Sequence, residues 1–198
     1  MRKLFKPQGA GLGMYSFKNT LTTFIVCTAL TAPVLTAELT NLRLYQLLII
    51  LLGATWPPTT PWGFITAVFM HPTVTDYVFD MLTLWLLGPF FETTFGARLY
   101  WITFMTSGIA SSLSTALFYL MGTPVVLGGS SGALFGLVGF LLMTPERGVI
   151  ISNPINILII AFLLSPLALE FGIAYLGHLL GFITGIIIGT AYMKQTNP

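Results

Sequence analysis

Residues 128–144 read GGSSGALFGLVGFLLMT, in which a bend rich in glycine and serine runs directly into an uncharged apolar stretch. A helix rises about 1.5 Å per residue, so about 20 apolar residues cross the roughly 30 Å hydrocarbon core of a bilayer. The stretch therefore predicts a membrane-spanning helix that begins at a polar bend.

Similar apolar runs lie on both sides of this stretch. Of the 198 residues, 55% are hydrophobic and 7% are charged, whereas soluble domains carry about 25% charged residues. So few charges leave no basic patch for a nucleic acid partner, and the single cysteine excludes an internal disulfide. We expect an all-α membrane protein with six transmembrane helices, the other five at 19–37, 73–91, 99–121, 155–170 and 172–192.

The stretch 44–56 bears on the topology, because it is strongly apolar but ends after 13 residues at Pro57-Pro58. It either lies in the membrane interface or makes a seventh span. Lysine and arginine collect on the cytoplasmic side, and six spans with a cytoplasmic N-terminus leave only Arg43 outside, which favours the interfacial position. The cations then expected in the cytoplasm are Arg2, Lys3, Lys6, Lys18, Arg98, Arg147 and Lys194.

This topology divides the chain into a cytoplasmic basic segment at 1–18, a six-helix domain at 19–194 and a short cytoplasmic tail at 195–198. We therefore expect a multi-pass protein of the inner cell membrane with both termini in the cytoplasm. A cleaved signal peptide is the alternative for the first span. Against it, 18 residues precede the apolar stretch and residues 35–37 lack a small residue at the first cleavage position.

Four ionisable side chains fall inside the expected spans, namely His71, Asp76, Asp80 and His178. Such groups are costly in lipid, so each is a functional candidate. Asp76 and Asp80 are four residues apart and share one face of a helix. A proton relay or a zinc site built from these four side chains is one alternative, although the His-Glu-x-x-His spacing is absent. We expect no cofactor and no metal.

Two glycine-rich motifs surround a serine and a histidine that should lie at similar depth. Counted from the charged residue that ends each span, Asp76, Ser131 and His178 all lie about 22–24 Å above the cytoplasmic end. A glycine-rich bend exposes the hydroxyl of Ser131, and the free N–H groups of the following helix suit an oxyanion. Glycines at every fourth position let two helices approach closely, which would bring His178 to Ser131. The glycines expected in this packing are Gly132, Gly136, Gly181 and Gly185.

These motifs resemble the rhomboid family of intramembrane serine proteases, over residues 62–189 and in the family's order. WGFITAVFMH at 62–71 resembles the segment that leads into the second span, and LGPFFE at 87–92 with Gly96 resembles its cytoplasmic end. Gly129-Ser130-Ser131-Gly132 matches the nucleophile motif, and HLLGFITG at 178–185 matches the base motif. Either glycine motif alone is a weak signal, but together they are specific.

The resemblance implies a six-helix bundle with a membrane-embedded first external loop at 44–61. A serine–histidine dyad without an acidic third member would cut transmembrane protein substrates near their outer end, within the lipid bilayer. By position, Ser131 is the nucleophile, His178 is the general base and Phe135 packs on the histidine ring. Candidates for the oxyanion or substrate site are Gly129, Asp76, Asp80, His71 and Phe135.

Three departures from the family pattern affect the expected function. Gly63 stands where the family has arginine, and Asp76 and Asp80 stand where it usually has histidine and asparagine as oxyanion donors. An ionised carboxylate donates no hydrogen bond and repels an oxyanion. Burial favours the neutral form of at least one carboxyl group, which could then donate, or the backbone amides do most of the work. The alternative function is a weak or inactive rhomboid-like protein that binds transmembrane helices.

Overall fold

The structure is a computed structural model that describes residues 17–163 and 175–196. Within these residues it contains helices and no strand, apart from one isolated bridge between Ala54 and Leu127. The all-α class is thereby confirmed. The helices are α1 (Lys18–Thr40), α2 (Leu42–Leu52), α3 (Gly63–Thr66), α4 (Val74–Ser112), α5 (Ser114–Leu120), α6 (Ser131–Leu142), η2 (Pro145–Arg147), α7 (Gly148–Ile151), α8 (Pro154–Leu163) and α9 (Tyr175–Thr196).

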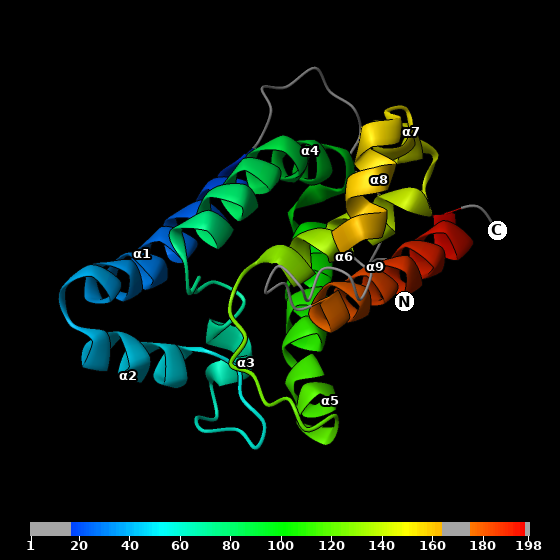
Figure 1. Cartoon of the computed structure of the whole chain (residues 1–198). Helices are drawn as coiled ribbons and strands as arrows, with labels where there is room; N and C mark the ends of the chain where they lie inside the picture. Colours follow the sequence, from blue (N-terminus) through cyan, green and yellow to red (C-terminus); the bar gives the residue numbers. More distant parts are fainter. Residues whose placement is uncertain (1–16, 164–174, 197–198) are drawn as a thin grey trace.

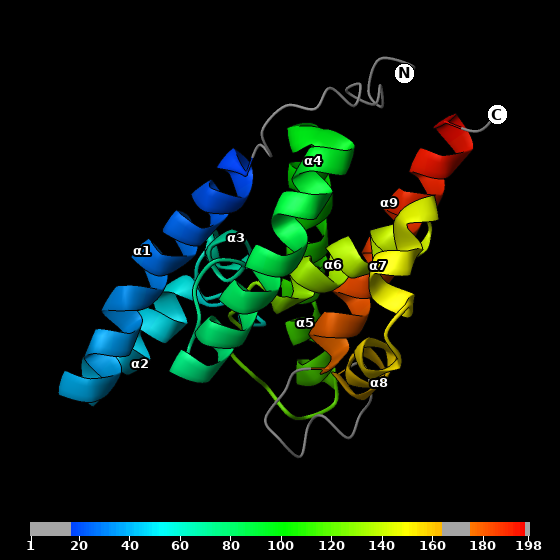
Figure 2. The same ribbon diagram turned by 90° about the horizontal axis from the view of Figure 1, so that it is seen from above.

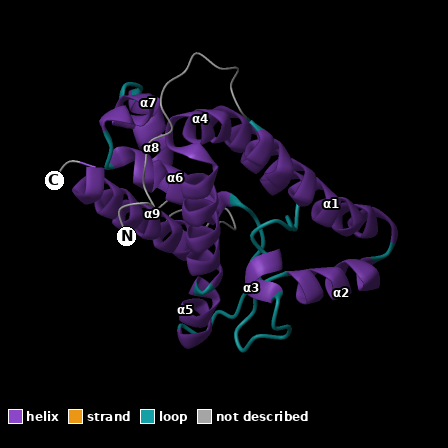
Figure 3. Ribbon diagram, turned by 180° about the vertical axis from the view of Figure 1, so that it is seen from behind, coloured by secondary structure: helices purple, strands orange, loops and turns teal. Residues whose placement is uncertain are grey.

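Helix α6 is the centre of the fold. Ten of its twelve residues are buried, because apolar side chains and glycines surround its whole circumference. Figure 1 shows α6 between α4 and α9, while α1 and α2 form a separate edge of the molecule. Viewed from above in Figure 2, α4 lies between α1 and α6. Figure 3, which views the molecule from behind, shows that α5 extends away from this core at the end of the molecule where α3 lies.

Helices α6 and α9 approach so closely that only glycine fits between them. A Cβ atom at Gly181 would collide with the carbonyl of Gly132, and one at Gly185 would collide with that of Gly136. On the other side of α6, a side chain at Gly132 or Gly136 would collide with a serine of α4. We call the four residues Gly132, Gly136, Gly181 and Gly185 the glycine interface; it holds the two helices in backbone contact.

Helices α1 and α4 are joined instead by polar side chains. The carboxylate of Glu92, only 4% exposed, accepts hydrogen bonds from the backbone N–H groups of Asn19 and Thr20 at 3.0–3.2 Å. It therefore caps the N-terminus of α1, where free N–H groups and the helix dipole favour a negative charge. Farther along α1, the hydroxyl of Thr28 lies 2.7 Å from that of Tyr77. We call these contacts the polar interface.

The count of six spans remains a prediction. By length and composition, two described helices can cross a membrane, α1 and α9, and α6 followed by residues 145–151 makes a third candidate bent by 115°. The expected spans at 73–91 and 99–121 lie largely in α4, which is broken at Gly96 with φ of 82°. Part of the spans at 155–170 and 172–192, and residues 1–16 and 197–198 of the expected cytoplasmic ends, lie outside the described residues.

Candidate active site

Ser131 is the first residue of α6, directly after a sharp bend. Gly129 has φ of 127°, a conformation that side-chain-bearing residues rarely adopt, and its N–H donates to the carbonyl of Ala67 at 2.8 Å. This contact ties the bend to the segment that follows α3. The first hydrogen bond of the helix runs from the N–H of Leu134 to the carbonyl of Ser130. The amides of residues 131–133 therefore precede the hydrogen-bonded ladder and have no partner within the helix, and Ser131 is the one of the three that lines the cavity described below.

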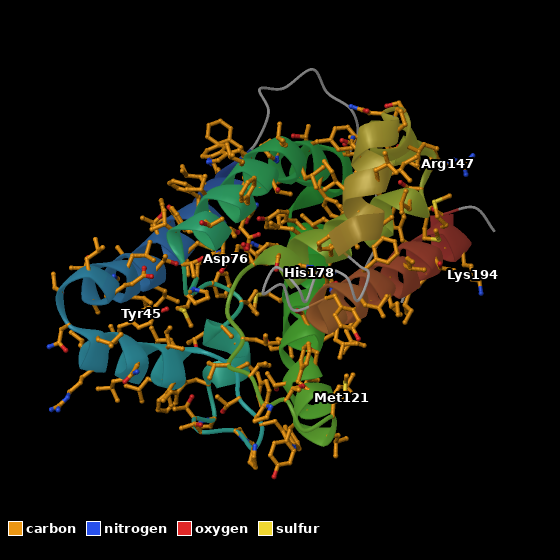
Figure 4. All side chains as sticks on the ribbon, viewed as in Figure 1. Tyr45, Asp76, Met121, Arg147, His178 and Lys194 are labelled. Atoms are coloured by element: carbon orange, nitrogen blue, oxygen red, sulfur yellow. The ribbon has the colours of Figure 1, made fainter. Side chains whose placement is uncertain are left out.

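The structure brings Ser131 and His178 together. Nε2 of His178 lies 2.9 Å from Oγ of Ser131, a hydrogen-bonding distance between residues 47 positions apart in the chain. The ring of Phe135, one turn along α6, stacks on the His178 ring with centroids 4.7 Å apart and planes inclined by 26°. His178 is 8% exposed and lies near the start of α9, as Figure 4 shows. The glycine interface sets the distance between Ser131 and His178, because Gly181 lies one turn along α9 from His178.

A small cavity opens beside this pair. Its volume is about 30 Å³, and its walls include Ser131, His178, Ser111 and the bend at 127–129. Such a space holds one or two water molecules when polar groups line it. A water molecule can therefore lie next to the serine and the histidine, although a peptide segment needs the walls to move.

Asp80 and His71 pack against the bend that precedes Ser131. Oδ2 of Asp80 lies 3.0 Å from Nε2 of His71, and the hydroxyl of Ser130 donates to the same Oδ2 at 3.0 Å. A Cβ atom placed on Gly129 would be 3.5 Å from this oxygen and 3.8 Å from Oγ of Ser131. Of the two aspartates expected at the site, Asp80 is therefore the one that approaches the nucleophile.

Asp76 has a different position from the one expected. It lies exposed in the first turn of α4, where Oδ2 accepts a hydrogen bond from the hydroxyl of Thr73 at 2.8 Å. The Thr73 oxygen in turn accepts from the N–H of Asp76 at 3.2 Å. The pair thus caps the start of α4 in the manner of a capping box. Figure 4 shows Asp76 near the start of α4; it does not line the cavity beside Ser131.

Two further residues of this region were not expected from the sequence. Ser130, fully buried, touches both His71 and Asp80, and Thr31 of α1 lies 3.0 Å from Nδ1 of His71. Thr31 follows Thr20, Thr23 and Cys27 on one buried face of α1, a helical spacing that could have marked it. Among the described residues, no three His, Cys, Asp or Glu side chains are arranged to hold a metal ion.

The fold and the site together define a class of protein. It is the class of helical membrane proteins in which a serine at the start of a buried helix meets a histidine of another helix. Within this class the family is clear, because the family model for the Rhomboid domain matches residues 58–195. The chain therefore belongs to the rhomboid family and is an integral membrane protein. The matched region begins after α2 and includes both members of the pair.

Individual relatives agree with this assignment. RHOMBOID-like protein 1 of Arabidopsis thaliana is 31% identical over 137 residues, which cover 67% of this chain and 34% of that protein. Rhomboid protease GluP of Bacillus subtilis (strain 168) is 27% identical over 134 residues, 66% of this chain and 26% of GluP. Rhomboid protease GlpG of Serratia proteamaculans (strain 568) is 23% identical over 133 residues, 64% of this chain and 46% of GlpG. The aligned part of the chain thus spans about a quarter to a half of these relatives.

Proposed function

We propose that this protein is an intramembrane serine protease that hydrolyses peptide bonds of transmembrane protein substrates. The observation that carries the proposal is the 2.9 Å contact between Oγ of Ser131 and Nε2 of His178 beside a water-sized cavity. Membership of a family whose relatives include proteins named as proteases supports it.

In the proposed reaction, Oγ of Ser131 attacks the carbonyl carbon of the scissile bond while Nε2 of His178 takes the hydroxyl proton. The amides at the start of α6 stabilise the oxyanion of the tetrahedral intermediate. His178 then returns the proton to the leaving amine, and an acyl ester remains on Ser131. Water from the cavity, deprotonated by His178, hydrolyses the ester and restores the free serine. The ring of Phe135 keeps the imidazole in place throughout.

The proposal includes the arrangement of the helices across the membrane. Six spans with both termini in the cytoplasm place the expected cations on one side of the membrane. In Figure 4, Arg147 and Lys194 lie at the same edge of the molecule, toward the end of α9 and away from its start, which carries His178. The site would then lie toward the outer side of the inner cell membrane, where water reaches it from outside, and α2 would lie in the interface.

A second candidate function is helix binding without efficient proteolysis. The observation that favours it is the carboxyl group of Asp80, whose oxygen lies against the bend that carries the nucleophile. If this group is ionised, its charge opposes the oxyanion, and loss of stabilisation by one donor costs about 10²–10³ in rate. Binding of transmembrane substrates would then persist while cleavage is slow or absent.

One experiment separates the two functions. The full chain in liposomes is incubated with a fluorophosphonate probe and, separately, with a transmembrane reporter peptide. We expect labelling and cleavage in the wild type, loss of both in Ser131→Ala and His178→Ala, and neither loss in Ser152→Ala, an exposed serine remote from the cavity. Reporter binding without labelling or cleavage in the wild type contradicts the protease and supports the binding function.

A further inference from the structure

Four buried residues form a continuous hydrogen-bonded network behind the nucleophile. His71 is its centre: Nδ1 lies 3.0 Å from Oγ1 of Thr31, and Nε2 lies 3.0 Å from Oδ2 of Asp80. Ser130, at the N-terminal end of α6, directs its backbone N–H at the same Nε2 at 3.3 Å. The residues come from α1, α4, the segment before α4 and the bend before α6, so the network joins four parts of the fold.

The backbone amide of Ser130 decides where the proton of the imidazole lies. An amide N–H only donates, and a buried one that finds no acceptor is costly. Ser130 is fully buried, and within residues 17–163 and 175–196 Nε2 of His71 is the only acceptor found for its N–H. Nε2 must therefore present its lone pair, and the imidazole proton lies on Nδ1.

The remaining contacts are satisfied by the same assignment. Nδ1–H of His71 donates to Oγ1 of Thr31, which also accepts the backbone N–H of His71 at 3.1 Å. The hydroxyl of Thr31 is then left to donate to the carbonyl of Phe69, 3.4 Å away. On the other side of the ring, Oδ2 of Asp80 faces the lone pair of Nε2 at 3.0 Å. Two lone pairs do not attract, so a proton must lie on Oδ2.

We propose that Asp80 is a neutral carboxylic acid that donates its proton from Oδ2 to Nε2 of His71. The two other arrangements leave the Ser130 amide facing an N–H group. A carboxylate beside a neutral imidazole protonated on Nε2 also buries a net negative charge, which is costly without a cationic partner. A carboxylate beside an imidazolium is neutral as a pair but has the same unsatisfied amide.

The neutral acid has a consequence for the reaction, and this consequence rests on the proposed function. Asp80 holds the bend through the hydroxyl of Ser130, so it positions the neighbouring Ser131 without touching the substrate. As an acid it adds no negative charge to the side of Gly129 where an oxyanion would form. A negative charge at this position would oppose the oxyanion and slow the acylation of Ser131.

Other titratable groups near the network must be separated from this effect. The thiol of Cys27 on α1 faces Asp80 and Ser130 and is fully buried. The ring of Tyr77 on α4 meets His71 edge-on with centroids 5.5 Å apart. His178 on α9 is the general base of the proposed reaction. Cys27→Ala and Tyr77→Phe therefore accompany the test.

The first measurement is the rate of fluorophosphonate labelling at neutral pH, with the full chain in liposomes. Asp80→Asn should retain at least about a tenth of the wild-type rate, because an amide replaces a neutral acid with loss of about one hydrogen bond. Asp76→Asn, which changes an exposed carboxylate one turn away, should label at about the wild-type rate, as should Cys27→Ala and Tyr77→Phe.

The second measurement is infrared spectroscopy of the same proteins, which needs no catalytic activity. The wild type and Ser131→Ala should show the carbonyl stretch of a protonated carboxyl group, and Asp80→Asn should lack it. If Asp80→Asn does not fold, Asp76→Asn should keep the band, which then does not come from the other aspartate. A wild type without such a band, or a band that is lost in Asp76→Asn, overturns the proposal. A band together with failure of every cleavage assay leaves Asp80 protonated and rejects only the protease.

Discussion

The glycine interface and the polar interface solve the same problem, joining two helices in an apolar protein, by opposite means. Between α6 and α9 the side chains are removed, so that backbone meets backbone at Gly181 and Gly132. Between α1 and α4 polar side chains remain and bond across the gap, as at Glu92 and Thr28. The first arrangement tolerates no added atom, whereas the second can lose a single bond and persist.

This difference matches what each interface carries. The glycine interface fixes the distance between Ser131 and His178, on which the proposed chemistry depends. The polar interface anchors the first helix, and Thr31 of that helix contacts His71, so the interface acts on the site only indirectly. We therefore expect changes in the glycine interface to damage activity more than stability, and changes in the polar interface to do the reverse.

The largest effect is expected for Gly181→Ala. Its Cβ atom would collide with the carbonyl of Gly132, so α9 must shift away from α6. Overpacking of this kind costs about 1–3 kcal/mol of stability, and a displacement of about 1 Å at the site lowers reaction rates about 10²-fold. The measurements are fluorophosphonate labelling and unfolding in detergent. Gly148→Ala, where a Cβ atom meets open space, is the matched control; equal labelling of the two variants would contradict the role of the interface.

An intermediate effect is expected for Glu92→Gln. The carboxylate accepts hydrogen bonds from two backbone amides at the start of α1, and bonds to a charged acceptor contribute about 1.5–3 kcal/mol. The free energy of unfolding should fall by about this amount, while labelling of the folded fraction is retained. Glu38→Gln, at an exposed position of the same helix, should change little. A loss of labelling in a stably folded Glu92→Gln would contradict the expectation that the polar interface affects stability more than activity.

The smallest effect is expected for Thr28→Val. This change removes the bond to the hydroxyl of Tyr77 and should cost about 0.5–1.5 kcal/mol of stability. Thr36→Val is a close control, because both threonines also bond to the carbonyl four residues earlier but Thr36 is exposed. Thermal unfolding of the two variants in the same detergent gives the comparison. Equal shifts would mean that the bond to Tyr77 contributes nothing.

The sequence predicted the parts of the site that depend on repeated spacing. Glycines four residues apart indicated where α6 and α9 meet, and the helix register then brought Ser131 close to His178. Phe135 followed from the resemblance to the rhomboid family, which places an aromatic ring on the histidine. Spacing works here because a glycine ridge leaves a single close packing, so the register of one helix fixes that of the other.

The sequence did not separate Asp76 from Asp80, because a spacing of four residues puts both on one helical face. The separating signal is Thr73, whose hydroxyl oxygen accepts the N–H of Asp76 and marks the start of α4, so that Asp76 lies in its first turn. Asp80, one turn farther along, reaches the buried side. Thr31 and Ser130 were missed because hydrogen bonds between distant segments have no local pattern.

The most direct test of the account is a double-mutant cycle on cleavage of a transmembrane reporter by wild type, Ser131→Ala, His178→Ala and the double variant. Because the serine and the histidine act as one unit, each single change should lower the rate at least about 10³-fold, and the double change should lower it no further. Cleavage that survives Ser131→Ala, or losses that multiply in the double variant, would contradict a shared proton transfer between these two residues.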